Sequence, residues 1–215
     1  MSRSNRPTLG QRIFAKILAT LEEENYRRTK ERKLRLFTGV TGEVLEIGPG
    51  TGANFPFFDL SVRWTGVEPN EAMHEPLLEK AAQLGLHINL ITGLSEELGG
   101  EDDRYDHVIS TGVLCSVDDQ SAVLREIKRV LKPGGRFLFV EHVIDPVSFT
   151  RGVFQRAAPY SPWRYLSGGC DPSRDTGSAI RDAGFSRVEM EAYDQEGGGW
   201  IGALTRSHVC GYAFK

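Results

Sequence analysis

The feature that most constrains the fold is a glycine-rich turn placed directly after a short apolar segment. Residues 43–47 (Glu-Val-Leu-Glu-Ile) resemble a buried strand, and the turn that follows reads Gly48-Pro49-Gly50-Thr51-Gly52. Glycine adopts backbone conformations that other residues avoid, and it allows bare backbone to approach a ligand closely. A helix is expected after this turn. The strand, turn and helix together predict an α/β fold whose first loop binds a nucleotide-like ligand.

Expected strands and helices alternate from Gly42 onward, which predicts βαβ units and a mostly parallel sheet. The last two strands are expected to form an antiparallel pair joined by the loop Gly197-Gly198-Gly199. Lys132-Pro133-Gly134-Gly135 is expected to be a sharp turn, and residues 145–174 a looser region rich in proline and aromatic side chains. The expected strands are residues 43–47, 64–68, 88–92, 105–110, 136–142, 187–193 and 208–214, and the expected helices are 71–84, 119–131 and 175–183.

The first 40 residues differ in charge from the rest of the chain. They hold ten basic and only four acidic side chains, although the whole chain has a formal net charge of −3. Ile13, Ile17 and Leu21 recur at helical spacing, which predicts one or two amphipathic helices. We therefore divide the chain into an N-terminal segment, residues 1–40, and a domain, residues 41–215. The segment could cap the core, act as a lid, or contact an anionic membrane surface weakly.

Composition limits the setting and the partners of the chain. Its 215 residues are 40% apolar, which suits a soluble α/β domain, and no stretch approaches the ~20 apolar residues that span a bilayer. Cys115, Cys170 and Cys210 have no CxxC or Cys/His spacing, so neither disulfides nor a metal site are expected. We expect a cytoplasmic protein, and the slight negative charge does not favour a nucleic-acid partner.

Further motifs lie where the later strands of the expected sheet end. Glu68 ends the second strand before Pro69, where a carboxylate can accept both ribose hydroxyls of a nucleoside. Leu94 and Ser95 follow the third strand, and Thr111 and Gly112 follow the fourth. In an open parallel sheet, ligands bind beyond the carboxyl ends of the strands, so these motifs are expected to share one site.

The order of these motifs resembles the class I S-adenosylmethionine (SAM) methyltransferases across residues 42–214. Their glycines are spaced G-x-G-x-G, as at Gly48, Gly50 and Gly52, whereas dinucleotide-binding turns read G-x-G-x-x-G. The resemblance implies a Rossmann-like, seven-stranded, mostly parallel sheet with an antiparallel last strand, helices on both faces and SAM as cofactor. It implies that the cofactor contacts Glu46, Gly48, Pro49, Gly50, Thr51, Gly52, Asn54, Glu68, Pro69, Leu94, Ser95, Thr111 and Gly112.

A narrower resemblance concerns the microsomal thiol S-methyltransferases. It is carried by short blocks that include Val113–Val117, Glu141–Val143, Gly169-Cys170 and Gly211–Ala213. Those enzymes begin with a hydrophobic membrane anchor, which the basic N-terminal segment does not replace. They also have Cys where Pro49 stands and Asp where Glu68 stands. The resemblance implies methylation of a small thiol.

Three residues near the end of the fifth strand are candidates for catalysis. A thiol must lose its proton before it attacks a methyl group, and its ordinary pKa is about 8.5. His142 is the first candidate base, with Glu141 and Asp145 as alternatives. Because side chains alternate along a strand, only one of Glu141 and His142 can face the pocket.

The acceptor atom is not determined by these motifs. No Asn/Asp-Pro-Pro-Tyr/Phe run or Pro-Cys nucleophile marks a nucleic-acid methyltransferase, so we expect a small-molecule acceptor. The alternatives to a thiol are oxygen, nitrogen or carbon of a lipid, quinone or natural product. A SAM-binding module without turnover is a further alternative, and the glycine spacing disfavours an NAD(P) oxidoreductase.

Overall fold

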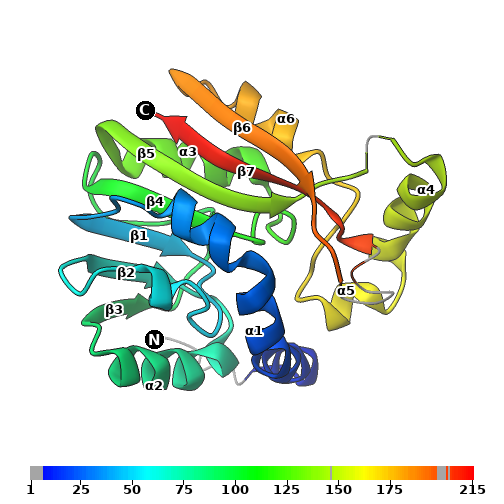
Figure 1. The fold of residues 1–215 in the computed structure, drawn as a ribbon, viewed down its shortest axis with the longest axis horizontal. Coiled ribbons are helices and arrows are strands. Elements are labelled where there is room, and N and C mark those ends of the chain that lie inside the picture. Colours follow the sequence, from blue (N-terminus) through cyan, green and yellow to red (C-terminus); the bar gives the residue numbers. More distant parts are fainter. Residues whose placement is uncertain (1–6, 146, 198–201, 203) are drawn as a thin grey trace.

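A mixed β-sheet forms the centre of the computed structural model, which describes residues 7–145, 147–197, 202 and 204–215 (Figure 1). Within these residues the sheet has seven strands in the order β3-β2-β1-β4-β5-β7-β6. Strands β1 to β5 run parallel, and β7 runs antiparallel to both β5 and β6. The predicted α/β class is confirmed. The strands are β1 (Glu43–Ile47), β2 (Arg63–Val67), β3 (Ile88–Ile91), β4 (Tyr105–Thr111), β5 (Leu131–His142), β6 (Arg187–Asp194) and β7 (Ser207–Phe214).

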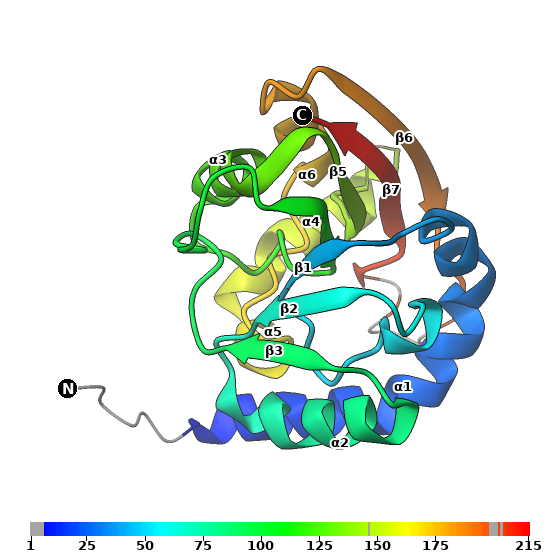
Figure 2. The same ribbon diagram turned by 90° about the vertical axis from the view of Figure 1, so that its left-hand side faces the viewer.

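Helices cover both faces of the sheet, as Figure 2 shows with α1 and α2 on one side and α3 and α6 on the other. Asp119 caps the N-terminus of α3 by accepting a hydrogen bond from the backbone N–H of Ala122. The α-helices are α1 (Leu9–Leu36), α2 (His74–Leu84), α3 (Gln120–Val130), α4 (Phe149–Ala157), α5 (Trp163–Leu166) and α6 (Thr176–Asp182). Short 3-10 helices are η1 (Phe55–Phe57), η2 (Glu71–Met73) and η3 (Ala158–Tyr160).

Side-chain alternation along the strands builds a separate core on each face of the sheet. In β1, Leu45 and Ile47 point to the face covered by α3 and α6, where Ile127 and Ile180 are fully buried. Val44 points to the opposite face. That second core contains Leu36, Phe37, Phe55, Trp64, Leu77 and Leu138, from α1, the loops and α2 as well as the sheet.

Strand β5 begins earlier than the sequence predicts. Leu131 already pairs with Tyr105, and the next pair joins Arg136 to His107, so the register shifts between them. The expected turn Lys132–Gly135 is therefore an irregularity within the strand rather than a separator before it. Gly134 takes a φ of 76°, a conformation that glycine adopts without strain.

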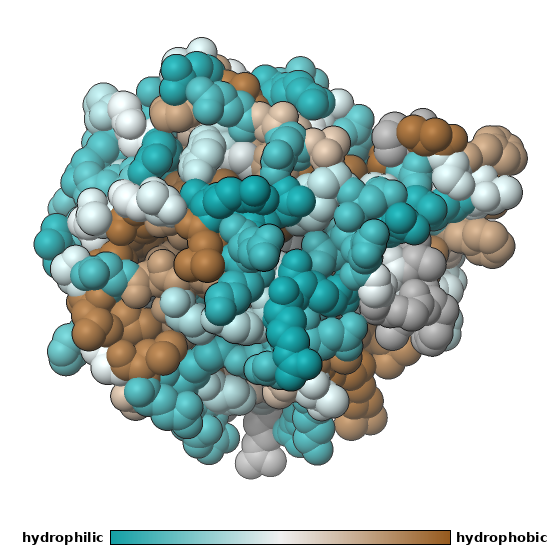
Figure 3. Space-filling model, viewed as in Figure 1, coloured by the Kyte–Doolittle hydropathy of each residue, from teal (hydrophilic) through white to brown (hydrophobic). Residues whose placement is uncertain are grey.

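The expected loose region, residues 145–174, contains α4, η3 and α5. These helices expose apolar side chains, since Phe149 is 84%, Phe154 66% and Tyr165 73% exposed. Figure 3 shows apolar residues at the end of the molecule that these helices form. Residues 1–6 of the basic segment and Gly198-Gly199 of the expected hairpin loop lie outside the described residues.

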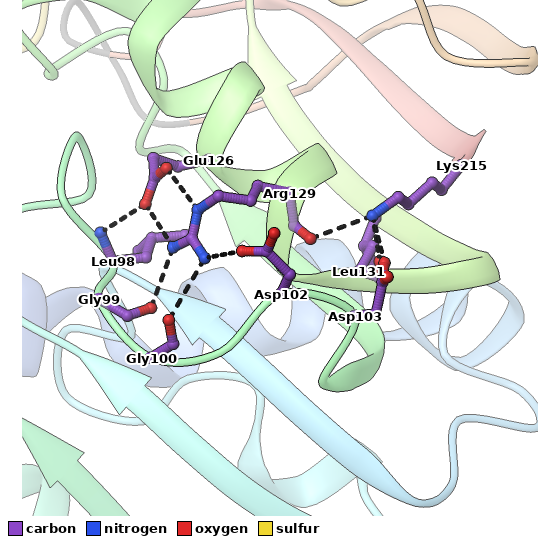
Figure 4. Close-up of polar contacts among 9 residues, drawn as sticks. All are labelled: Leu98, Gly99, Gly100, Asp102, Asp103, Glu126, Arg129, Leu131 and Lys215. Carbon is purple, nitrogen blue, oxygen red and sulfur yellow. Dashed lines mark hydrogen bonds and ion pairs between the residues drawn. The ribbon is translucent and has the colours of Figure 1, made fainter.

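A network of polar contacts centred on Arg129 lies beside the start of β4 (Figure 4). Its guanidinium bonds Glu126 at 2.8 Å, Asp102 at 2.6 Å and the carbonyl of Gly99 at 3.1 Å. Lys215 donates to the carbonyl of Leu131 at 2.7 Å. These bonds tie α3, the loop before β4 and Lys215 together at the end of the sheet opposite the carboxyl ends of the parallel strands.

Candidate functional site

The glycine loop after β1 has a backbone that side chains would strain. Gly48, Gly50 and Gly52 have φ values of 55°, 58° and 79°. A Cβ on Gly48 would lie 2.7 Å from Val113, and one on Gly52 would lie 2.6 Å from the ring of Phe55. At Gly50 the nearest atom is a methyl of Leu18 at 3.7 Å. A side chain at Gly48 or Gly52 would therefore clash with its neighbours, whereas Gly50 has more open space beside its backbone. The cofactor contacts of all three glycines stay predictions.

Glu68 links the loops that follow β1 and β2. One carboxylate oxygen accepts from the backbone N–H of Gly50 at 3.0 Å, and the other accepts from that of Asn70 at 2.8 Å. Desolvation by burial raises the pKa of Glu68, and these two bonds oppose the rise. A carboxylate has about four acceptor positions, so both oxygens retain capacity for further donors. Its predicted role as the acceptor for ribose hydroxyls stays a prediction.

Glu46 has a supporting position behind the loop. Its oxygens accept from Asn54 Nδ2 at 2.8 Å and from Trp64 Nε1 at 2.9 Å. Asn54 Nδ2 also donates to Thr111 at 2.9 Å, so the orientation of the amide is determined by its partners. Burial raises the pKa of Glu46 to about 7. The carboxylate is 2% exposed and holds Asn54 in place, while Asn54 Oδ1 is buried without a partner among the described residues.

The remaining predicted cofactor residues lie in or beside the loops after these strands. Leu94 is 59% exposed and Ser95 is buried, and their contacts with the cofactor stay predictions. Gly112 is exposed, with a φ of 68°, and its N–H donates to the carbonyl of Val140. Pro49 and Thr51 are buried in the glycine loop, and Pro69 is exposed after Glu68. The strand order proceeds from β1 outward to β3 on one side and from β4 to β5 on the other, so it changes direction between β1 and β4. Open parallel sheets bind ligands at this point.

Helix α1 crosses this edge. Leu18 faces Gly50, and Glu22 accepts a hydrogen bond from Thr51 at 3.4 Å. Farther along the helix, Lys33 and Leu36 are buried in the core. The first part of α1 therefore lies over the glycine loop, and its last turns close the core. Whether the helix acts as a lid stays a prediction. Among the residues that the structure describes, none of the helices has the length and hydropathy that a membrane-spanning segment requires.

Two of the three candidate bases have carboxylates occupied by other contacts. Glu141 is fully buried, and its oxygens accept from Ser110 Oγ at 2.5 Å and from the backbone N–H groups of Val113 at 3.2 Å and Leu114 at 3.1 Å. Burial raises the pKa of Glu141. This carboxylate holds the turn after β4.

Asp145 begins the segment that leads to α4. Its Oδ1 accepts from the backbone N–H groups of Val147 at 2.8 Å and Ser148 at 2.7 Å, and its Oδ2 pairs with Arg151. Such contacts stabilise the start of α4, so Asp145 has a structural position in this fold.

His142 lies on the opposite face of β5 from Glu141, beside two cysteines. Its Nε2 is 3.0 Å from Cys170 Sγ, and Cys115 completes a group whose nitrogen and sulfur atoms all lie within 4.8 Å of one another. A hydrogen bond with Cys170 and complete burial raise the pKa of Cys115. Burial alone would lower the pKa of His142, but the neighbouring Cys115 and Glu141 reverse the direction and raise it. Sequence spacing missed this group, although all three residues belong to the blocks singled out above.

Comparison with known proteins places the chain among methyltransferases. A methyltransferase domain family matches residues 45–139. The chain is 36% identical over 190 residues to the thiol S-methyltransferase TMT1B of Rattus norvegicus, and the aligned region covers 83% of this chain and 77% of that protein. It is 34% identical over 209 residues to the thiol S-methyltransferase TMT1A of Homo sapiens, covering 94% and 82%. A solved SAM-dependent methyltransferase of Thermotoga maritima has a TM-score of 0.63 at 22% identity, covering 94% and 98%, and so supports the fold alone.

Proposed function

We propose that this chain, which belongs to the family of SAM-dependent methyltransferases, transfers the methyl group of SAM to the sulfur of a small thiol. The observation that supports sulfur as the acceptor is the similarity of this chain to thiol S-methyltransferases over most of their length. The geometry adds that the blocks Val113–Val117, Glu141–Val143 and Gly169-Cys170 meet at the carboxyl ends of β4 and β5.

The residues of the first two loops fit the cofactor. Bare backbone at Gly50 and the carboxylate of Glu68 offer close approach and hydrogen-bond acceptors for a nucleoside with an amino-acid tail. When bound, SAM supplies a methyl group on a positively charged sulfur. Alignment and desolvation of the acceptor then account for most of the catalysis. Helix α1, which lies over Gly50 and Thr51, would help to exclude water.

A small acceptor is part of the proposal. The chain has a slight negative net charge, and its lone strongly basic segment, residues 1–40, is interrupted by Glu22, Glu23 and Glu24. A polyanionic nucleic acid would therefore find little electrostatic attraction. The exposed apolar side chains of α4 and α5 are better matched to an apolar small molecule.

The test is a methylation screen with isotopically methyl-labelled SAM. The acceptors are an alkyl thiol, an aryl thiol, the phenol and aniline of matching shape, and a quinone, with products identified by mass spectrometry. We expect labelled thioethers from the thiols and no product from the phenol and aniline. Methylation of oxygen, nitrogen or carbon with no thioether would refute the thiol assignment. Binding of S-adenosylhomocysteine by calorimetry without any methylated product would favour a SAM-binding module.

A further inference from the structure

A group of three buried side chains with nitrogen and sulfur donor atoms lies at the carboxyl ends of β4 and β5. Cys115 follows β4, His142 ends β5, and Cys170 precedes α6. Their exposed fractions are 0%, 8% and 5%. The two Sγ atoms and the imidazole nitrogen lie within 4.8 Å of one another, and Nε2 of His142 is 3.0 Å from Sγ of Cys170. Thiolates and imidazoles are the donors that zinc prefers in proteins.

The distances fit a tetrahedral cation after a small adjustment. Zinc lies about 2.3 Å from thiolate sulfur and about 2.0–2.1 Å from imidazole nitrogen, so tetrahedral ligands lie roughly 3.5–3.8 Å apart. His142 and Cys170 would have to separate by roughly half an ångström. Cys115 Sγ lies within 4.8 Å of both donor atoms and would have to approach them by at most roughly 1 Å. Such changes are within the reach of side-chain rotation.

Hydrogen bonds to backbone carbonyls order the two cysteine segments and hold them together. The N–H of Asp171 donates to the carbonyl of Cys115 at 3.0 Å, and Trp163 Nε1 donates to the carbonyl of Cys170 at 3.0 Å. Arg174 donates to the carbonyls of Leu114, at 3.2 Å, and Val117. The approach of the two sulfur atoms therefore follows from ordered loops and does not depend on the side chains alone.

The number of ligands indicates the kind of site. Among the described residues, no further Cys, His, Asp or Glu joins this group. Structural zinc sites usually have four protein ligands, whereas catalytic sites have three and leave one position to water or substrate. Gly112, one of the predicted cofactor contacts, has a carbonyl 3.7 Å from Cys115 Sγ. The group therefore lies beside a residue that is predicted to contact the cofactor.

We propose that Cys115, His142 and Cys170 bind one thiophilic divalent cation, zinc in the cell, with the fourth position open to the acceptor. The role of the cation rests on the proposed function. The acceptor thiol binds as a thiolate and releases its proton to solvent. Its sulfur then forms a bond to the methyl carbon while the bond from that carbon to the sulfonium sulfur breaks. The electron pair stays on that sulfur, which gives a thioether and S-adenosylhomocysteine.

The test measures metal binding by the whole chain, purified in a phosphine reductant without chelators. We expect one zinc per chain by elemental mass spectrometry. Co²⁺ in its place should give sulfur-to-cobalt charge-transfer absorption. Cys115→Ser, His142→Ala and Cys170→Ser should each weaken zinc binding by more than the 10–100-fold that loss of an outer-shell contact costs. Cys210→Ser is the matched control, because Cys210 is also buried but contacts Glu191 and Arg32 on β6 and α1 instead.

A folded, reduced chain that binds no zinc, or variants that bind it as tightly as the wild type, would overturn the site. If the variants fail to fold, native alkylation of the wild-type chain replaces them: zinc should protect Cys115 and Cys170 but not Cys210, and equal alkylation of all three would overturn the site. Zinc at this group without methylation of any thiol would support the site and refute the proposed function. Undiminished thiol methylation by metal-free chain would overturn the role of the cation and leave the proposed function standing.

Discussion

Glu68→Ala is expected to weaken cofactor binding and to destabilise two loops at once. The carboxylate is 6% exposed and accepts one hydrogen bond from Gly50 N–H, at 3.0 Å, and one from Asn70 N–H, at 2.8 Å. Its remaining acceptor positions are those predicted for the ribose hydroxyls. Alanine removes all of these contacts, whereas Glu68→Gln keeps one oxygen acceptor.

The magnitude follows from the charge of the carboxylate, with the contact to the two ribose hydroxyls counted as one interaction. Hydrogen bonds to a charged group contribute about 1.5–3 kcal/mol. Loss of the ribose contact should therefore weaken binding of S-adenosylhomocysteine about 10- to 150-fold, at ~1.4 kcal/mol for each factor of ten. The backbone N–H groups of Gly50 and Asn70 then lack an acceptor, which lowers the free energy of unfolding by ~1–3 kcal/mol for each group that water cannot reach. Glu68→Gln should have a ligand affinity and a free energy of unfolding between those of Glu68→Ala and the wild type.

Titration calorimetry with S-adenosylhomocysteine measures the affinity, and thermal unfolding measures the stability. Asp106→Ala is the matched control, because Asp106 also accepts a backbone N–H bond, from Glu43 at 2.8 Å, but at the opposite end of β1. The control should unfold at a lower temperature and bind the ligand as the wild type does. A folded Glu68→Ala chain with wild-type affinity would refute the ribose assignment, and equal loss of affinity in both variants would show a general effect of destabilisation.

Two further predictions concern stability. Gly48→Ala should lower the free energy of unfolding, measured by denaturant titration, by about 1–3 kcal/mol, because the added Cβ would lie 2.7 Å from Val113. Gly39 has a similar positive φ but open space around it, so Gly39→Ala should lower the free energy of unfolding less. Equal decreases in the two variants would contradict the packing argument. Burial lowers the pKa of His107 to about 4, helped by the positive charge of Arg136, so the folded state favours the neutral imidazole. With an unfolded pKa near 6.5, this contribution to stability is complete above about pH 6.5 and is lost as the pH falls toward 4. Urea midpoints should therefore decline less over this range in His107→Gln than in the wild type or in His87→Gln, a control at an exposed histidine, and parallel declines in all three would contradict the assignment.

Much of the fold could be predicted because its signals are local. The strand at Glu43–Ile47 has the predicted bounds, and most other elements differ from their predicted bounds by a few residues. Alternating apolar side chains and the glycine spacing operate over a few residues, so they can be recognised without knowledge of the partners. The predicted SAM cofactor is confirmed by the methyltransferase family match. The start of β5 was predicted wrongly, because a Pro-Gly-Gly run reads as a turn unless the pairing of Leu131 with Tyr105 is known.

The sequence by itself determined the class of the fold, the strand ends that carry the cofactor motifs, and that Glu141 and His142 point to opposite faces. Only the tertiary structure decided which face each one meets. Glu141 turns toward the loop after β4, where three donors occupy it, and His142 turns toward Cys115 and Cys170. Ligand spacing in the chain cannot reveal such a group when a different segment carries each member. The physical reason is that pairing of parallel strands, and bonds such as that from Asp171 N–H to the Cys115 carbonyl, bring distant segments together at one edge of the sheet.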